Sequence, residues 1–464
     1  MSVVTHAEGT SQLRALIQAS GLTYDALARL ITAVARENGD HLVHPNRSAI
    51  AHWLSGSVPA PRTRQYLAEA LSRRLGRPLS VAHLGFPPDD DDVQLGLLLT
   101  EDPVSILSEL ASADLRRRSF LSQAAYSVLA LASVITPAAG LRPLDGLART
   151  SRAVRMPGQR IGAADVQAVR DVTAALTALD ERLGGQNGRD TVVTWLTNDV
   201  AAMCRGVFTS DAVRQQMFSA AAEVAYLAGW KSHDSGLESL AQRYYLQAYQ
   251  LATQAEGTGH SAYVLRIMTH HALDIAQPEH CVDIAEEAWR RAHGSGPQLQ
   301  SLYAFTVSRA HAATGNAHQA DSWLARAETL TSREDTSPIP SWVSLGGSAQ
   351  TRMASQAAKT FTRLGRHSKA EPLYARTASN WNPSTHPRVL ALALNNLAGA
   401  QAAQGHLDQA CTTWIRALDG LTLASDSSAR ARSALTDIRT RIQAPRLRTN
   451  AAARELRAQL NPHP

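Results

Sequence analysis

The sequence predicts an all-α protein, and three observations support this prediction. Hydrophobic residues make up 44% of the chain but aromatic residues only 5%, which favours helices packed through small side chains. From about residue 162 to the end, no convincing alternation of polar and apolar residues marks a strand. A set of glycine, alanine and bulky residues also recurs at fixed spacing in the second half, which is typical of helical hairpins.

Residues 10–86 are expected to form four or five short helices around a small core. The helical spacing of Leu13, Leu16 and Ile17 ends at Gly21, and Thr23 is a good N-cap for a second helix. Pro45 and Asn46 open a third helix that Gly56 ends, and QYLAEALSRRLG is a fourth that Gly76 ends. The further core residues that this pattern predicts are Leu27, Leu30, Ile31, Val34, Ile50, Trp53, Leu54, Val81, Leu84 and Phe86.

Charge and turn residues divide the chain into three segments. Two prolines at 87–88 are followed by four aspartates at 89–92, whose like charges repel one another and keep the chain extended. A first domain is therefore predicted at 1–86. An acidic linker and helical connector follow at 87–160, and a helical domain covers 161–464. Within the connector, RRRSFL at 116–121 and the apolar run after it are similar to a twin-arginine export signal. About 115 residues precede this stretch, so we interpret it as a buried connector helix, with an exported protein as the alternative.

The second half contains an internal repeat. A glycine is followed after five residues by alanine, after four more by a bulky residue and after three more by a small one. The four copies are Gly236, Ala241, Tyr245, Ala248; Gly315, Ala320, Leu324, Ala327; Gly365, Ala370, Tyr374, Thr377; and Gly405, Ala410, Trp414, Ala417. A degraded copy is Ala276, Cys281, Ala285, Ala288. Each glycine would end one helix and each small residue would let the next pack closely, so the hairpins would stack into a superhelix rather than a plain bundle.

Two stretches resemble known families. IAHWLSGSVP (50–59) resembles the exit of the recognition helix in the Cro/repressor (XRE) type of helix-turn-helix, and LRALIQASGLTYDALARLI (13–31) resembles its first two helices. TAVARENGDHLVH stands where that family has a tight turn. The spacing over about 220–425 resembles tetratricopeptide (TPR) repeats. The order of the two, and the stretch FSAAAEVAYLAGWKSHDSGLESLAQRYYLQAYQLA, resemble actinobacterial (Streptomyces-type) transcriptional regulators with a TPR-like α-solenoid.

The helix-turn-helix resemblance implies binding to double-stranded DNA. In that family the start of the recognition helix enters the major groove, while flanking residues contact phosphates. The positions that match are Thr23, Tyr24, Asn46, Arg47, Ser48, Ala49, His52, Arg62 and Arg64. Asn46 has an alternative role as a helix cap, and His52 as a solvated surface residue.

The charge of the chain argues for two copies on DNA. The formal net charge is +6, and residues 1–88 carry nine arginines, no lysine and five acidic residues, a net of +4 (9 − 5). This is modest for a DNA-binding domain, because affinity rises with the number of phosphates that are neutralised. We therefore expect a homodimer that reads two half-sites.

The TPR resemblance places the first helix of each hairpin on a concave face. Counting back from each turn gives inward candidates that combine cations with aromatic rings: Tyr226, Trp230, Arg266, His270, Phe305, Arg309, Arg352, Lys359, Asn395 and Asn396. This set predicts a peptide or small-molecule effector that is anionic or bears a carboxylate. The alternatives are an ordinary solvated face or contacts between subunits. An effector would act by favouring one curvature of the superhelix.

Several classes of chemistry have no motif. GxxxxGK[ST] and HExxH are missing, GHSA at 259–262 falls short of GxSxG, and His270 and His271 are adjacent and so diverge on a helix. We therefore expect no cofactor, no metal, no membrane partner and no enzymatic activity. The three cysteines lie far apart, which favours a reduced, cytoplasmic environment. The predicted function is a sequence-specific transcriptional regulator, and the alternative is a TPR scaffold that does not bind DNA.

Overall fold

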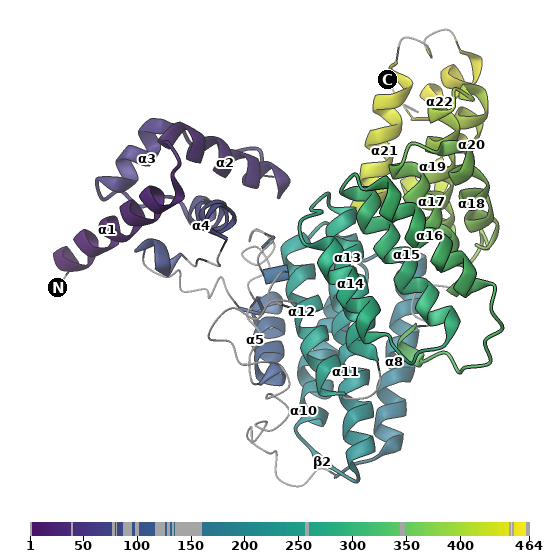
Figure 1. The fold of residues 1–464 in the computed structure, drawn as a ribbon, viewed down its shortest axis with the longest axis horizontal. Helices are drawn as coiled ribbons and strands as arrows, with labels where there is room; N and C mark the ends of the chain where they lie inside the picture. Colours follow the sequence, from purple (N-terminus) through teal and green to yellow (C-terminus); the bar gives the residue numbers. More distant parts are fainter. Residues whose placement is uncertain are drawn as a thin grey trace. The chain divides into compact units, whose positions relative to one another are not determined.

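The protein is all-α, as the sequence predicts (Figure 1). The computed structural model describes residues 2–38, 40–76, 79, 81–86, 95–97, 102–116, 126–127, 130–131, 134, 160–255, 259–343, 349–444, 447 and 450–460. The chain divides into two compact units. Unit 1 comprises Met1–Ala153 and Leu237–Gln247, and unit 2 comprises Val154–Gly236 and Ala248–Pro464.

Unit 1 begins with a small helical core. Its elements are α1 (Ser2–Ser20), α2 (Tyr24–Glu37), α3 (Arg47–Leu54), α4 (Pro61–Leu75) and a 3-10 turn, η1 (Ala82–Leu84). The predicted core residues are buried together, and only Leu30 among them lies partly buried at the edge. Burial of these aliphatic faces holds the short helices in place, because helices of this length are marginal on their own.

The predicted helix ends are confirmed. The Thr23 hydroxyl accepts a hydrogen bond from the Ala26 amide at 3.2 Å and caps α2. Gly76 ends α4 with φ +64°, a left-handed conformation that a residue without a β-carbon adopts readily.

The rest of unit 1 packs α5 (Pro103–Arg116) with the first part of α12 (Glu238–Gln254). The Tyr244 hydroxyl donates to Oδ2 of the fully buried Asp114 at 2.7 Å. The predicted acidic linker (87–92) and most of the RRRSFL stretch lie outside the described residues, so their predictions are untested.

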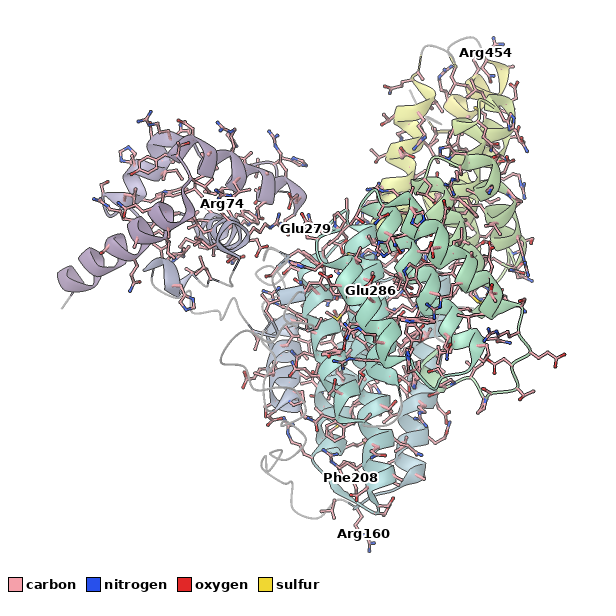
Figure 2. The ribbon with its side chains drawn as sticks, viewed as in Figure 1. Arg74, Arg160, Phe208, Glu279, Glu286 and Arg454 are labelled. Atoms are coloured by element: carbon pink, nitrogen blue, oxygen red, sulfur yellow. The ribbon has the colours of Figure 1, made fainter. Side chains whose placement is uncertain are left out.

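Unit 2 is a run of helices with one short parallel strand pair. β1 (Arg160–Ile161) pairs with β2 (Val207–Phe208), and Figure 2 shows Arg160 and Phe208 at one end of the unit. Two residues per strand are too few for the alternation that a sequence pattern needs. The helices and turns are α8 (Ala163–Leu183), α9 (Arg189–Trp195), the π-turn η3 (Leu196–Val200), α10 (Ala201–Cys204), α11 (Asp211–Asp234), α13 (His260–Asp274), α14 (Cys281–Arg291), α15 (Pro297–Ala313), α16 (Ala317–Thr331), η4 (Ser341–Val343), α17 (Ala349–Arg363), α18 (His367–Ser379), α19 (Pro387–Ala403), α20 (Leu407–Ala424), α21 (Ala429–Ile442) and α22 (Ala451–Leu460).

From α13 to α20 these helices pack as successive hairpins (Figure 1). Gly315, Gly365 and Gly405 lie between the two helices of a hairpin and have positive φ angles. Ala276, in the degraded copy, has φ +58° and takes up the same left-handed conformation without being glycine. The predicted small and bulky positions are buried: Ala241, Tyr245, Ala248, Cys281, Ala285, Ala288, Ala320, Leu324, Ala327, Ala370, Tyr374, Thr377, Ala410, Trp414 and Ala417.

The first and last helices of unit 2 also pack together. α8 contacts both α11 and α19, and α11 contacts α21. The turn η4 lies against α11. Part of the face formed by the first helices of the hairpins is therefore covered, whereas the repeat pattern alone predicts an open face.

Candidate functional sites

The helix α3 has one buried side and one exposed side. Ile50, Trp53 and Leu54 are buried in the core of unit 1, whereas Arg47 and His52 are exposed. Ser48 is also exposed, and Ala49 is half-buried. The sequence-predicted readers Arg47, Ser48 and His52 thus share the solvent side of a helix whose opposite side is fixed by packing.

Asn46 has a structural role at the start of this helix. Its Oδ1 accepts a hydrogen bond from the Ala49 amide at 2.9 Å, and its backbone is extended (φ −122°). This is the N-cap geometry that the sequence offered as the alternative to base contact. The side-chain amide group still has its two N–H donors. Thr23 likewise caps α2, and Tyr24 is half-buried against the core.

The two arginines of α4 differ in accessibility. Arg62 keeps 41% of its side-chain exposure, and its guanidinium lies 3.4 Å from Oδ2 of Asp40. Arg64 is only 7% exposed, and its contact with a DNA phosphate stays a prediction. Arg64 precedes the buried Leu67 and Leu71 by three and seven residues, so helical spacing places it on the inner face.

Asp40 is a buried acid that the sequence analysis missed. It is 9% exposed, and Tyr66 donates to its Oδ2 at 3.4 Å. Burial, together with the charge of Asp40, raises the pKa of Tyr66 to about 12. Asp40 thus joins the loop before α3 to α4.

In unit 2 the predicted inward residues lie along the first helices of the hairpins. Trp230 on α11, His270 on α13 and Lys359 on α17 are half-buried, whereas Arg266 is 2% exposed and Arg309 7%. We call this set, with Tyr226, Asp274 and Arg352, the inner strip. The outer members of the prediction differ. Phe305 is 4% exposed and acts as core. Asn395 accepts a hydrogen bond from the Trp414 indole at 3.1 Å, and Asn396 is exposed.

One end of the inner strip contains the carboxylate of Asp274. Its carboxylate forms ion pairs with Arg309 and with Lys359, the latter at 3.2 Å. Burial alone would raise the pKa of Asp274, but Lys359 and Arg309 outweigh it and hold that pKa well below its usual value. Asp274 follows His270 by four residues, and this helical spacing is a signal by which the sequence could have found it.

The other end of the inner strip contains a cation without such a carboxylate. The guanidinium of Arg266 lies 5.3 Å from the ring centroid of Tyr263, and its Nε has no hydrogen-bond partner among the described residues. Burial lowers the pKa of Arg266, and the side chains that act on it most strongly are Tyr263, Arg352, Tyr303 and Tyr226. His270, between the two ends, shares a 2.9 Å hydrogen bond with Thr306.

The strip is bordered by α8 and η4. The Glu223 carboxylate on α11 lies 3.6 Å from Arg170 of α8 and accepts a hydrogen bond from Ser341 of η4 at 3.1 Å. Trp342 stacks on His260, with ring centroids 5.1 Å apart and planes at 5°. Burial raises the pKa of Glu223 to about 7.

A buried ionic network, also missed from sequence, lies beside the strip. Asp180 of α8 forms ion pairs with Lys231 at 3.1 Å and Arg388 at 3.4 Å, and Arg388 also pairs with Asp234 at 2.9 Å. All four residues are at most 2% exposed. The Trp230 indole donates to Asp180 at 2.9 Å, so this predicted ligand residue is positioned by the network.

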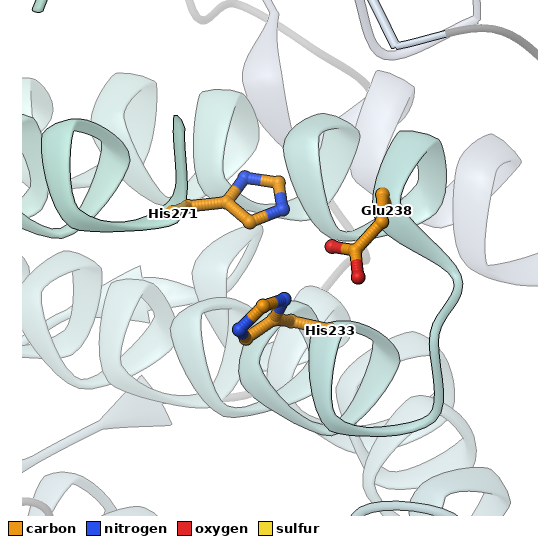
Figure 3. A group of neighbouring side chains, drawn as sticks. All are labelled: His233, Glu238 and His271. Atoms are coloured by element: carbon orange, nitrogen blue, oxygen red, sulfur yellow. The ribbon is translucent and has the colours of Figure 1, made fainter. Parts of the chain in front are cut away.

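Two imidazoles meet at the ends of α11 and α13. The rings of His233 and His271 are 5.0 Å apart, edge to face. Figure 3 shows the two imidazole side chains. His271 points to a different helix from His270, as expected for adjacent helical positions.

The comparisons with known proteins concern the small helical core of unit 1. A family model described as the SP15 N-terminal domain matches residues 13–87. This segment is similar to the SP15 N-terminal domain. The SP15-like segment contains α2, α3 and α4, and it covers less than a fifth of the 464 residues. No curated protein and no solved structure matches the chain.

None of the described helices is long and apolar enough to cross a membrane.

Proposed function

We propose that this protein is a sequence-specific DNA-binding transcriptional regulator. The observation that carries the proposal is α3, which exposes Arg47, Ser48 and His52 on one side while its other side is anchored in the core. An exposed arginine in the first turn of a helix can pair with both acceptors of guanine in the major groove. The resemblance of 13–31 and 50–59 to Cro/repressor-type domains supports the same reading.

The charges around α3 favour a dimer. Arg62 is paired with Asp40, and Arg73 lies 2.6 Å from Glu37 and 2.9 Å from Glu69. These arginines are partly neutralised within unit 1, so a single copy has few cations left for phosphates. We infer that two copies bind together and read two half-sites.

The experiment is selection of genomic fragments by the full-length protein, followed by affinity measurements over a range of salt. We expect selected sites and a steep decrease of affinity with salt. Arg47→Ala should weaken binding to the selected site by about 1–3 kcal/mol and relax the preference at one base pair. The matched control is Arg376→Ala, which removes an exposed arginine from α18. Absence of selected sites and of salt dependence would instead favour the scaffold.

We further propose that unit 2 binds a regulatory ligand in its inner strip. The combination of aromatic rings with buried and half-buried cations supports this role, since such groups recognise the anionic part of a ligand. The ligand would shift the protein between two conformations that differ in DNA affinity, by no more than its difference in affinity for the two.

A further inference from the structure

The starting point is the unbalanced charge of Arg266. This side chain is 2% exposed, and its Nε has no hydrogen-bond partner among the described residues. No carboxylate is among the charges that act on it most strongly. Burying an unpaired cation costs free energy of folding, because the protein interior solvates a charge less well than water does.

The polar groups around Arg266 carry N–H and O–H hydrogen-bond donors. The phenol oxygen of Tyr303 is buried and also has no hydrogen-bond partner among the described residues. The ring of Tyr263 lies under the guanidinium, and Tyr226 and Arg352 are close enough to act on Arg266 electrostatically. Two guanidinium groups and three phenols can together donate several hydrogen bonds to one anion.

The cluster has a shallower and a deeper part. Tyr226 and Arg352 are half-buried, whereas Arg266 and Tyr303 lie deeper. An anion could therefore enter past Tyr226 and Arg352 and end against Arg266.

Two other cations of the inner strip, Arg309 and Lys359, differ from Arg266 because they have a carboxylate partner. Arg309 and Lys359 share the carboxylate of Asp274, so each of them already has an ion-pair partner within the protein. The structure thus gives the cations at one end of the strip an ion-pair partner, whereas Arg266, at the other end, has no carboxylate partner among the described residues.

We propose that Arg266 and Arg352, with the phenols of Tyr226, Tyr263 and Tyr303, form a subsite for the acid group, carboxylate or phosphate, of a small-molecule effector. The proposal rests on the proposed ligand-binding role of unit 2, but anion binding is measured on the protein without DNA. Loss of DNA binding would therefore contradict the regulator role and leave this subsite standing, and the reverse also holds.

The test is thermal unfolding of the full-length protein in inorganic phosphate and in succinate, each against chloride at equal ionic strength. Either anion should raise the Tm of the wild type by about 2–4 °C near saturation, because a ligand that binds the native state stabilises it. The arm that responds identifies the acid group. Equal Tm values in phosphate, succinate and chloride would overturn the proposal.

Two variants make the test specific. Arg266→Met should abolish the rise, and without anion its Tm should equal or exceed that of the wild type, since an unpaired buried charge is removed. Tyr303→Phe keeps the ring and removes only the hydroxyl, so it should fold and show a smaller rise at the same anion concentration. Arg376→Met, an exposed change on α18, is the control and should respond as the wild type does. A full response in both Arg266→Met and Tyr303→Phe would also overturn the proposal; if Arg266→Met does not fold, Tyr303→Phe alone decides.

Discussion

The ammonium of Lys359 lies 3.2 Å from Oδ1 of Asp274 and so joins α17 to α13, 85 residues apart in the chain. Arg309 shares the same carboxylate. One acid thus forms ion pairs with two cations from two different helices, and its removal should be felt in all three hairpins.

We expect Asp274→Asn to lower the free energy of unfolding by about 2 kcal/mol, less than for a fully buried pair because the side chain keeps 24% of its exposure. The change leaves Arg309 and Lys359 to repel each other. Urea unfolding measures the loss. Asp437→Asn breaks an exposed pair with Arg441 and is the control, with an expected change below about 0.5 kcal/mol. Equal losses in the two variants would show that Asp274 has no such role.

Ala276 is held in a left-handed conformation (φ 58°) where the four other copies of the repeat have glycine. Ala276→Gly should therefore raise the free energy of unfolding by about 1 kcal/mol, because the strain on the β-carbon is relieved. Ala325→Gly, at an exposed position inside α16, should lower it by about 1 kcal/mol. Urea denaturation of both variants tests the sign. A destabilised Ala276→Gly would contradict this account of the turn.

His260 should make unit 2 sensitive to acid. Burial, and then the charge of Arg170, lower the pKa of His260 to about 3, whereas the unfolded value is about 6.5. Between these values the unfolded chain binds the extra proton, so this part of the stability is present above pH 6.5 and is lost as pH falls towards 3.

The measurement is urea unfolding between pH 7 and pH 4 for the wild type and His260→Gln. The stability of the wild type relative to the variant should fall by up to about 1.4 kcal/mol per pH unit. His293→Gln, at an exposed position after α14, serves as the control and should keep the wild-type slope. Parallel pH profiles for wild type and His260→Gln would be inconsistent with a buried neutral imidazole.

Asn46 should contribute to the stability of α3 independently of any DNA contact. Asn46→Ala removes the cap and should cost about 1 kcal/mol, seen as about fivefold faster amide hydrogen exchange in α3. Asn46→Ser keeps a capping oxygen and should stay within about twofold of the wild type. If both variants exchange equally fast, the cap is not what holds the helix start. Arg47→Ala is for this reason the cleaner test of base contact.

The features that the sequence predicted correctly are local. Thr23, Gly76 and the glycines of the repeat act through their own backbone conformation or that of residues within one turn, so their residue type suffices. The small core of unit 1 followed from helical spacing for the same reason. The burial of Arg64 likewise agrees with its spacing from Leu67 on the inner face of α4.

The features that the sequence did not reveal depend on distant partners. Helical spacing from His270 could have placed Asp274 in the strip, but its pairing could not be predicted because its two cations lie 35 and 85 positions later. The covering of the inner strip by α8 and by Trp342 likewise depends on contacts between residues that are distant in the sequence. Which of the predicted cations has a carboxylate partner could be decided only once these distant residues were placed.

The carboxylate of Asp234 accepts hydrogen bonds from the Gly185 amide and from Ser428, which lie 49 and 194 positions away, besides its pair with Arg388. Arrays of stacked hairpins usually unravel from a free end, since each hairpin touches only its neighbours. Unit 2 has no such free end at α21, because the start of α21 helps to solvate a charge on α11. Loss of α21 would here take a hydrogen-bond donor away from that charge, so this helix cannot be removed from the array without cost to α11.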